Sequence, residues 1–219
     1  MATLLKTNKW FFLPYAVLLV LAGIWLLQYS KGDFLLLLNG HHNQFWDGLF
    51  HFTNNFGEAG FYVVFLLLLL FYRINYALLG GIVLSETALV VQLLKQVVFP
   101  HVDRPYNFFQ AKGISLHLVD GVTVHKHFSF PSGHTATAFA MLCLLALLLH
   151  NKWWGFPLLL CAAFGGLARI YLAQHFLVDV FFGSLIGVAL ALINVQWLAP
   201  REWFTTTFHL PLHHKLRKK

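Results

Sequence analysis

Two residues near the C-terminal third of the chain have the types and the spacing of a nucleophile and its orienting acid. His175 and Asp179 are four residues apart, so they share one face if this segment is helical. A carboxylate beside an imidazole selects one tautomer of the ring and stabilises its charged form. This pair therefore has the composition that a histidine nucleophile requires.

The sequence Pro131-Ser132-Gly133-His134 is typical of a helix start that binds an anion. Pro131 suits the first turn of a helix, and we expect Ser129 to be the N-cap. The free N–H groups of a first turn attract oxyanions. Gly133 would let such an oxyanion approach the backbone, and Ser132 would add a hydroxyl donor.

Three basic residues could supply positive charge to phosphoryl oxygens: Lys95, Arg104 and Arg169. Arginine suits bidentate phosphate binding, whereas lysine acts as a point charge. A single arginine near the end of a membrane span usually extends toward the interface, and a single histidine at a helix start is usually structural. The coincidence of all these groups in one chain favours a phosphate-ester site.

The composition is that of a membrane protein. Hydrophobic residues make up 58% of the 219 residues and charged residues only 11%, against about 25% charged in soluble domains. We expect one domain, residues 1–219. The net charge of +7 comes from scattered or terminal basic residues, which does not favour a nucleic-acid partner. Cys143 and Cys161 lie in apolar runs, which favours packed thiols over a disulfide or a metal pair.

Six segments reach or approach the length of a bilayer span, so we expect an all-α bundle of six transmembrane helices. About 20 helical residues cross a hydrocarbon core of about 30 Å. The first segment follows Lys6 and Lys9 as a signal peptide would, but its length is that of a retained span. The predicted spans are Trp10–Tyr29, Phe56–Tyr72, Tyr76–Phe99, Pro131–His150, Trp154–Leu172 and Phe176–Leu198.

The distribution of basic residues predicts that both termini are cytoplasmic, because short cytoplasmic loops are enriched in lysine and arginine. The inner face would then carry Lys6, Lys9, Arg73, Lys152, Arg201 and the basic tail Lys215, Arg217, Lys218 and Lys219, which could anchor at anionic headgroups. The candidate site falls at the extracytoplasmic end. We expect the inner membrane of a bacterium from the compact six-span form.

Two segments outside the predicted spans are expected on the outer side. Phe45–Phe50 is amphipathic and could lie along the membrane surface. The loop Pro100–Phe130 joins the third and fourth spans, and loops of its length, roughly 30 residues, are usually functional or disordered. Its basic and aromatic residues favour function. Within it, His125, Lys126 and His127 would contact a second phosphate or a sugar headgroup, or else form a solvated basic loop; few acidic or cysteine partners are present for a metal site.

Two groups of polar residues near or within the predicted spans have less certain roles. Asn54, Asn55 and Glu58 lie near the start of the second span, where capping of that helix is the expected role and a place at the rim of the site is the alternative. Glu86 is nine residues from Lys95 and so should point to the opposite side of the third span. We expect Glu86 to pair within the bundle.

These residues resemble the signature of the type 2 phosphatidic acid phosphatase superfamily, which includes membrane lipid phosphatases and vanadium haloperoxidases. The first block of the signature is Lys, six residues, then Arg-Pro; here eight residues separate Lys95 from Arg104. The second block, Pro-Ser-Gly-His, is unchanged. The third is Ser-Arg, five residues, His, three residues, Asp, and it matches Arg169, His175 and Asp179, with Ala168 in place of the serine.

The resemblance implies a reaction that needs neither a metal nor a cofactor. His175 would attack phosphorus and form a phosphohistidine, oriented by Asp179. His134 would protonate the leaving oxygen and then activate water. The residues that would hold the phosphoryl oxygens are Lys95, Arg104, Ser132, Gly133 and Arg169.

The function implied is a membrane lipid phosphate or pyrophosphate phosphatase whose partners are its lipid substrate and the bilayer, with no obligate protein partner. Candidate substrates are undecaprenyl pyrophosphate, phosphatidylglycerol phosphate, phosphatidic acid and lipid A phosphates. A lipid-to-lipid phosphotransferase would use the same residues, and a non-catalytic protein that binds lipid headgroups is a third reading. Haloperoxidase activity is disfavoured because its known chemistry belongs to soluble relatives.

Overall fold

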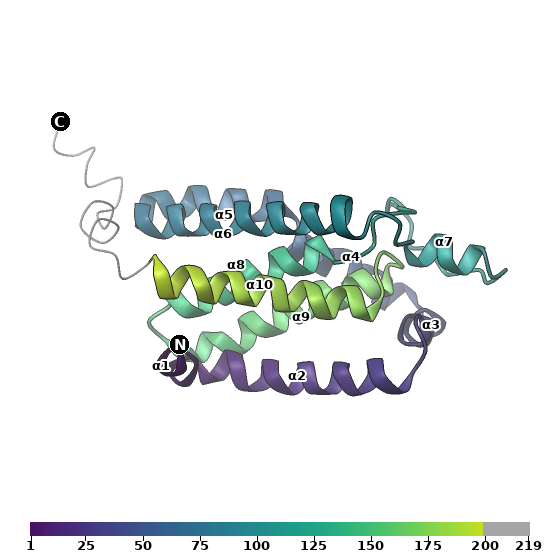
Figure 1. Ribbon diagram of the computed structural model, residues 1–219, viewed down its shortest axis with the longest axis horizontal. Coiled ribbons are helices and arrows are strands. Elements are labelled where there is room, and N and C mark those ends of the chain that lie inside the picture. Colours follow the sequence, from purple (N-terminus) through teal and green to yellow (C-terminus); the bar gives the residue numbers. More distant parts are fainter. Residues whose placement is uncertain (199–219) are drawn as a thin grey trace.

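The computed structural model describes residues 1–198, and these residues form a helical bundle without a strand (Figure 1). The predicted all-α architecture is confirmed. The predicted basic tail lies outside the described residues. The helices are α1 (Ala2–Thr7), α2 (Lys9–Gln28), α3 (Asp33–Gly40), α4 (Gln44–Asn54), η1 (Asn55–Gly57), α5 (Ala59–Tyr72), α6 (Ile74–Leu93), η2 (Leu94–Val98), α7 (Pro105–Gln110), α8 (Gly133–Leu148), η3 (Lys152–Trp154), α9 (Gly155–Tyr171) and α10 (Leu177–Trp197).

A helix is present in each of the six predicted spans, but not all have the length of a span. Four segments are long and apolar enough: Lys9–Gln28, Ile74–Val98, Lys152–Tyr171 and Leu177–Trp197. Helices α4 and α5 form a pair bent by 53°, which could make a fifth. Two predicted boundaries were wrong. The second span begins at Ala59 because η1 precedes it, and the fourth runs only from Gly133 to Leu148.

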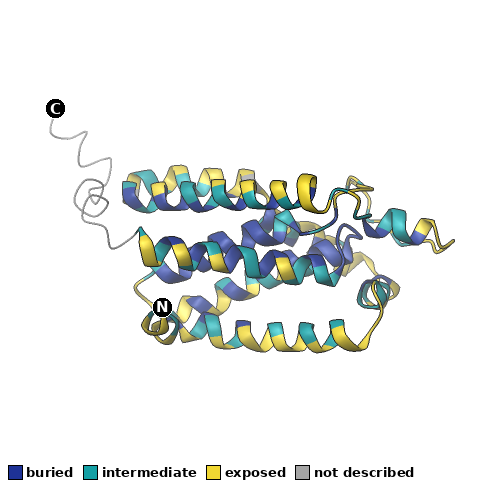
Figure 2. Ribbon diagram, viewed as in Figure 1, coloured by how far each residue is buried: buried dark blue, intermediate teal, exposed yellow. Residues whose placement is uncertain are grey.

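The short helix α8 lies at the centre of the bundle, in contact with α6, α9 and α10. Twelve of its 16 residues are buried, and Figure 2 shows it almost entirely in the colour of buried residues. A helix that is apolar on all sides is stable only where other helices surround it. Helix α2 has the opposite character, because only Phe11 and Tyr15 within it are buried.

Helices α8 and α10 approach closely because α10 presents glycines to the backbone of α8. A Cβ atom on Gly187 would lie 2.3 Å from the carbonyl oxygen of Ala136, and one on Gly183 would lie 2.7 Å from that of Ser132. Small residues at a helix interface allow such backbone contact in membranes. The start of α10 is thereby held beside the start of α8.

The chain termini of the described part lie at one end of the bundle, and α3, α7 and the long loop lie at the other (Figure 1). The N-terminal ammonium of Met1 donates to Oε1 of Gln196 at 2.9 Å. Deeper in the bundle, Nδ2 of Asn194 donates to Oε2 of Glu86 at 2.6 Å, which confirms that Glu86 pairs within the bundle. Cys143 and Cys161 are free thiols, as predicted.

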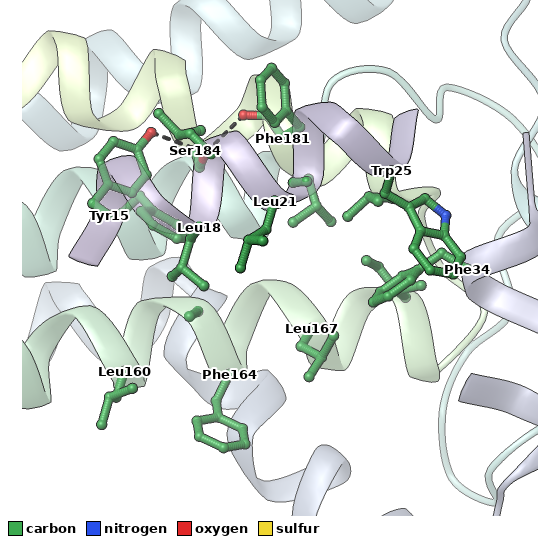
Figure 3. Close-up of a pocket in the computed structure, with 17 residues that line it drawn as sticks. Tyr15, Leu18, Leu21, Trp25, Phe34, Leu160, Phe164, Leu167, Phe181 and Ser184 are labelled. Atoms are coloured by element: carbon green, nitrogen blue, oxygen red, sulfur yellow. Dashed lines mark hydrogen bonds between the residues drawn. The ribbon is translucent and has the colours of Figure 1, made fainter. Parts of the chain in front are cut away.

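A groove of about 440 Å³ separates α2 from α9 and α10 (Figure 3). At one end of the groove the hydroxyl of Tyr15 lies 3.1 Å from Oγ of Ser184. Leucine and aromatic side chains such as Leu21, Trp25 and Phe164 line the rest, and none of its lining residues is charged. The groove is larger than the polar cavity described below, but it holds no group for phosphate chemistry.

The glycine contact between α8 and α10 predicts a stability difference between two matched substitutions. Gly187→Ala should destabilise the protein by ~1–3 kcal/mol, because the added methyl group meets backbone that cannot move aside. Gly23→Ala, in α2, has no atom within 4 Å of the new Cβ and should be neutral or mildly stabilising. Thermal unfolding in detergent measures both, and a Gly187→Ala protein as stable as Gly23→Ala would contradict the packing.

Candidate active site

A buried histidine and aspartate form the centre of the polar cluster. His175 immediately precedes the N-cap of α10, and Asp179 lies in the first turn. Nδ1 of His175 is 3.3 Å from Oδ2 of Asp179, and each side chain is 1% exposed. The same oxygen accepts the backbone N–H of Phe176 at 2.9 Å. Because Nδ1 faces the carboxylate, Nε2 is the ring nitrogen left for nucleophilic attack.

The His175 ring is surrounded by positive charge. Burial, followed by the charges of Arg104, Lys95 and Arg169, lowers the pKa of His175 well below its usual value of 6.5. The ring is therefore neutral at physiological pH and carries the lone pair that a nucleophile needs.

Ser129 and Ser132 each have a different role in the structure from the one predicted. Ser129 is not the N-cap of the fourth span; its hydroxyl donates to Oδ2 of Asp179 at 2.5 Å. Ser132 is the N-cap, because its Oγ accepts the N–H of Thr135 at 3.3 Å and lies 2.8 Å from Oγ1 of that residue. Pro131 consequently precedes the helix rather than lying in its first turn. The carboxylate of α10 competes for Ser129, a tertiary contact that overrides the local preference.

One glutamine that the sequence did not single out connects two of the predicted cations. Oε1 of Gln174 accepts from Arg104 at 3.2 Å and from Arg169 at 3.5 Å. Its amide nitrogen donates to the carbonyl of Thr123 at 3.1 Å, which orients the group. Gln174 is neutral and occupies one of the unspecified positions within the third signature block, so only its place next to His175 could have drawn attention to it.

Arg169 has one hydrogen-bond donor without an acceptor. The guanidinium is held by Oδ1 of Asn54 and by Gln174, yet its buried Nε has no partner among the described residues. A buried donor that is left unpaired costs ~1–3 kcal/mol, and water, an ion or a ligand can satisfy such a group. A phosphoryl oxygen would satisfy this donor.

Lys95 reaches the same cluster despite the long gap in the first signature block. It lies in the π-helical turn η2, which holds more residues per turn than an α-helix, and its side chain is buried. Its charge acts on His175, as noted above. Arg104 caps α7, and its Nε donates to the carbonyl of His127 at 2.9 Å.

His134 lies in the first turn of α8 and pairs with a carboxylate of its own. Its Nε2 is 2.9 Å from Oε1 of Glu58. Glu58 occupies the N-cap position of α5 but makes no capping hydrogen bond with its side chain, so the predicted capping role was wrong for this residue. Asn54 likewise serves Arg169 rather than a helix end. The alternative, a place beside the site, holds for both.

The three residues His125, Lys126 and His127 do different things. His125 lines a polar cavity of about 270 Å³ together with His134, Arg169 and Gln174. Burial, together with the charges of Arg104, Arg169 and Lys95, lowers the pKa of His125. All three residues are exposed, and the backbone carbonyls of Lys126 and His127 accept from Arg104. Among residues 1–198, no group of three His, Cys, Asp or Glu side chains is placed to hold a metal ion.

The sequence of this chain is similar to those of a family of known proteins. Residues 75–203 match the profile of the PAP2 superfamily. The undecaprenyl-diphosphatase BcrC of Bacillus subtilis is 29% identical over 82% of this chain and 90% of its own length. The lipid A 4'-phosphatase of Bacteroides thetaiotaomicron is 28% identical over 70% of each chain.

Two solved structures share the fold. LpxE of Aquifex aeolicus superposes with a TM-score of 0.66 at 25% identity, covering 78% of this chain and 98% of its own. A PAP2-type phosphatidylglycerolphosphate phosphatase of Bacillus subtilis superposes with a TM-score of 0.65 at 19% identity, covering 86% and 96%. The chain belongs to the PAP2 superfamily. The predicted family and the predicted class of enzyme, a membrane phosphatase, are confirmed.

Gln174 is the shared acceptor of the Arg104 and Arg169 guanidinium groups, and its removal should weaken anion binding. A hydrogen bond to a charged group contributes ~1.5–3 kcal/mol, so Gln174→Ala should weaken the binding of inorganic phosphate by about tenfold or more. Titration calorimetry in detergent measures the affinity. Gln110→Ala, at an exposed position on α7, is the matched control; equal affinities in the two variants would show that Gln174 does not organise the cations.

Proposed function

We propose that this protein is a lipid phosphatase that removes the terminal phosphate of undecaprenyl diphosphate. The observation that carries the proposal is the meeting, at one end of a membrane bundle, of a neutral buried histidine, a second histidine and three cations, one of which has an unpaired buried donor. The relative from Bacillus subtilis, which aligns over most of both chains, is named for this substrate. Lipid A and phosphatidylglycerol phosphate, named in other relatives, are the competing substrates.

In the proposed reaction the terminal phosphoryl group is transferred first to His175 and then to water. Nε2 of His175 attacks phosphorus, and the bond from phosphorus to the bridging oxygen breaks. His134 gives its proton to that oxygen, so undecaprenyl phosphate leaves. Water then attacks the phosphohistidine, His134 takes the proton, and the release of phosphate restores His175.

The cations would stabilise charge on the phosphoryl oxygens in both steps. Lys95, Arg104 and Arg169 surround the His175 ring closely enough for their charges to act on it. Gly133 would contribute a backbone N–H group at the start of α8. The Oγ of Ser132 accepts in the helix cap and its backbone N–H donates to the carbonyl oxygen of Asp179 at 3.0 Å, so a contribution from Ser132 would have to come from its hydroxyl hydrogen.

We further propose that all six predicted helices cross the membrane, with both termini cytoplasmic and the site on the extracytoplasmic side. Helix α8 can be short because α6, α9 and α10 surround it, and it does not need to match the bilayer thickness by itself. The junction of α5 with α6, which contains Arg73, and the segment before α9, which contains Lys152, lie at the end of the bundle opposite α3 and α7 (Figure 1). Their positions agree with a cytoplasmic inner end.

The direct test is phosphate release from a panel of lipids in detergent with EDTA present. Undecaprenyl diphosphate should be hydrolysed faster than lipid A, phosphatidylglycerol phosphate or phosphatidic acid. Transfer of phosphate to a second lipid, without free phosphate, would identify a phosphotransferase. Binding without turnover of any of these lipids would support a headgroup-binding protein instead.

Substitution of the proposed nucleophile tests the covalent route. His175→Ala should reduce phosphate release by about 10,000-fold or more, because the attacking atom is lost. It should also abolish the acid-labile phosphoenzyme that is trapped by rapid quenching. His150→Ala, at the opposite end of the bundle, should retain the parent rate. A His175→Ala protein that releases phosphate at that rate would exclude the covalent route.

The low pKa of His175 sets the acid side of the pH profile. The neutral ring attacks, and it is lost only when pH falls through the depressed pKa, so activity should persist as pH drops through 6.5. The profile of kcat/KM against pH should therefore have its acid limb below pH 6.5. An acid limb above this value would contradict the electrostatic description of the site.

A further inference from the structure

We propose that Glu58 is the positioning residue of the general acid and base, His134. Its carboxylate would fix the ring through Nε2 and stabilise the protonated form that the leaving oxygen requires. The proposal rests on the proposed function, since it assigns a role within that reaction. Glu58 lies outside all three signature blocks.

The contact has the geometry of a histidine–carboxylate dyad. Oε1 of Glu58 is 2.9 Å from Nε2 of His134, within the range of a charge-assisted hydrogen bond. With Nε2 engaged, Nδ1 is the nitrogen left to exchange a proton with substrate or water. The pair thus mirrors His175 and Asp179, where the carboxylate holds Nδ1 and leaves Nε2.

The environment of His134 disfavours its protonated form, which a carboxylate beside the ring would offset. Burial disfavours the imidazolium form of His134, and the charges of Arg169 and Lys95 disfavour it further. A general acid must nevertheless carry a proton when the leaving oxygen departs. Glu58 is the acidic group that acts on His134 in the opposite sense. The negative charge of the substrate would add to its effect.

Glu58 lies beside His134 because η1, which precedes it, packs closely against α8. A Cβ atom on Gly57 would lie 2.6 Å from Cβ of His134 and 2.9 Å from its carbonyl oxygen. No residue with a side chain fits there without displacing the segment. The carbonyl of Phe56 is fixed by the hydroxyl of Tyr62 at 2.6 Å. Glu58 is therefore held beside His134 by packing on both sides.

A structural role for the carboxylate has little support. It makes no capping bond to α5, and its side chain is 49% exposed. Both Glu58 and His134 line the cavity of about 270 Å³ that also exposes Arg169. Removing the charge should therefore change the chemistry of the cavity and leave the bundle folded.

The test compares the pH dependence of kcat/KM in Glu58→Gln with that of the parent, using phosphate release from undecaprenyl diphosphate. An opposite charge at this distance shifts the titration of its partner by about one pH unit or more. The basic limb, where His134 loses its proton, should move to lower pH by about that amount. The acid limb, set by His175, should stay in place. A merely structural defect would lower the rate without moving either limb.

Two further variants sharpen the comparison. Glu58→Asp keeps the charge and should restore most of the basic limb. Glu86→Gln replaces another carboxylate that pairs with a neutral amide far from the site, and it should leave the profile unchanged. A basic limb that stays in place in Glu58→Gln, with parental folding, would overturn the assignment.

Titration of the His134 ring by nuclear magnetic resonance separates this inference from the proposed function. Protein labelled with ¹⁵N-histidine should show a lower titration midpoint for His134 in Glu58→Gln, with the signal identified by its loss in His134→Gln. A shifted midpoint in a protein that hydrolyses no lipid would remove the proposed function and still support the pairing. An unshifted midpoint in an active enzyme would overturn the pairing and leave the function standing.

Discussion

Three cations share one buried space, and the rest of the site follows from this. Lys95, Arg104 and Arg169 are each exposed by less than a tenth. The desolvation of such ions costs several kcal/mol each even in relaxed proteins, and their mutual repulsion adds to that cost. The glycine contact of α10 with α8 and the π-helical turn of η2 bring these groups together. An arrangement this unfavourable persists because the fold around it determines it strongly.

The partners of the two arginines explain why the site can still attract an anion. Arg104 and Arg169 are held by backbone carbonyls and by the amides of Gln174 and Asn54, all neutral. Carboxylates in these places would neutralise the arginines and compete with phosphate. The acids that do enter the site, Asp179 and Glu58, each contact a histidine. The positive field is thus left largely uncompensated, and burial together with this field keeps the His175 ring neutral.

Most of the charged groups of this site could be predicted from sequence, whereas the residues that hold and orient them could not. Arg169, His175 and Asp179 have spacings that carry meaning on their own, and the six apolar segments predict the helices that gather them. Gln174 is neutral and gives no such signal. Asn54 and Glu58 act across 115 and 76 positions of the chain, a separation that local patterns do not reveal.

The two serines near Pro131 show that local sequence leaves some roles undecided even within a few residues. Ser129 and Ser132 are both plausible caps, and the choice is made by Asp179, which takes the hydroxyl of Ser129. The long gap between Lys95 and Arg104 is a similar case. The π-helical turn η2 holds more residues per turn than an α-helix, and a count along the chain does not show this. In each case a tertiary contact or a local irregularity decides among options that the sequence leaves equal.

The two histidine–carboxylate pairs differ in exposure in a way that suits their proposed roles. His175 and Asp179 are each 1% exposed and sit between the two helices that the glycines bring closest, where an attacking atom can be held in a fixed line with phosphorus. The side chains of His134 and Glu58 are 31% and 49% exposed and open to the polar cavity. In the second half of the proposed reaction His134 activates the water that attacks the phosphorus carried on Nε2 of His175. The polar cavity reaches His134 and Arg169, so it gives water access to His134, and the phosphoryl group would extend into it from the buried His175 ring.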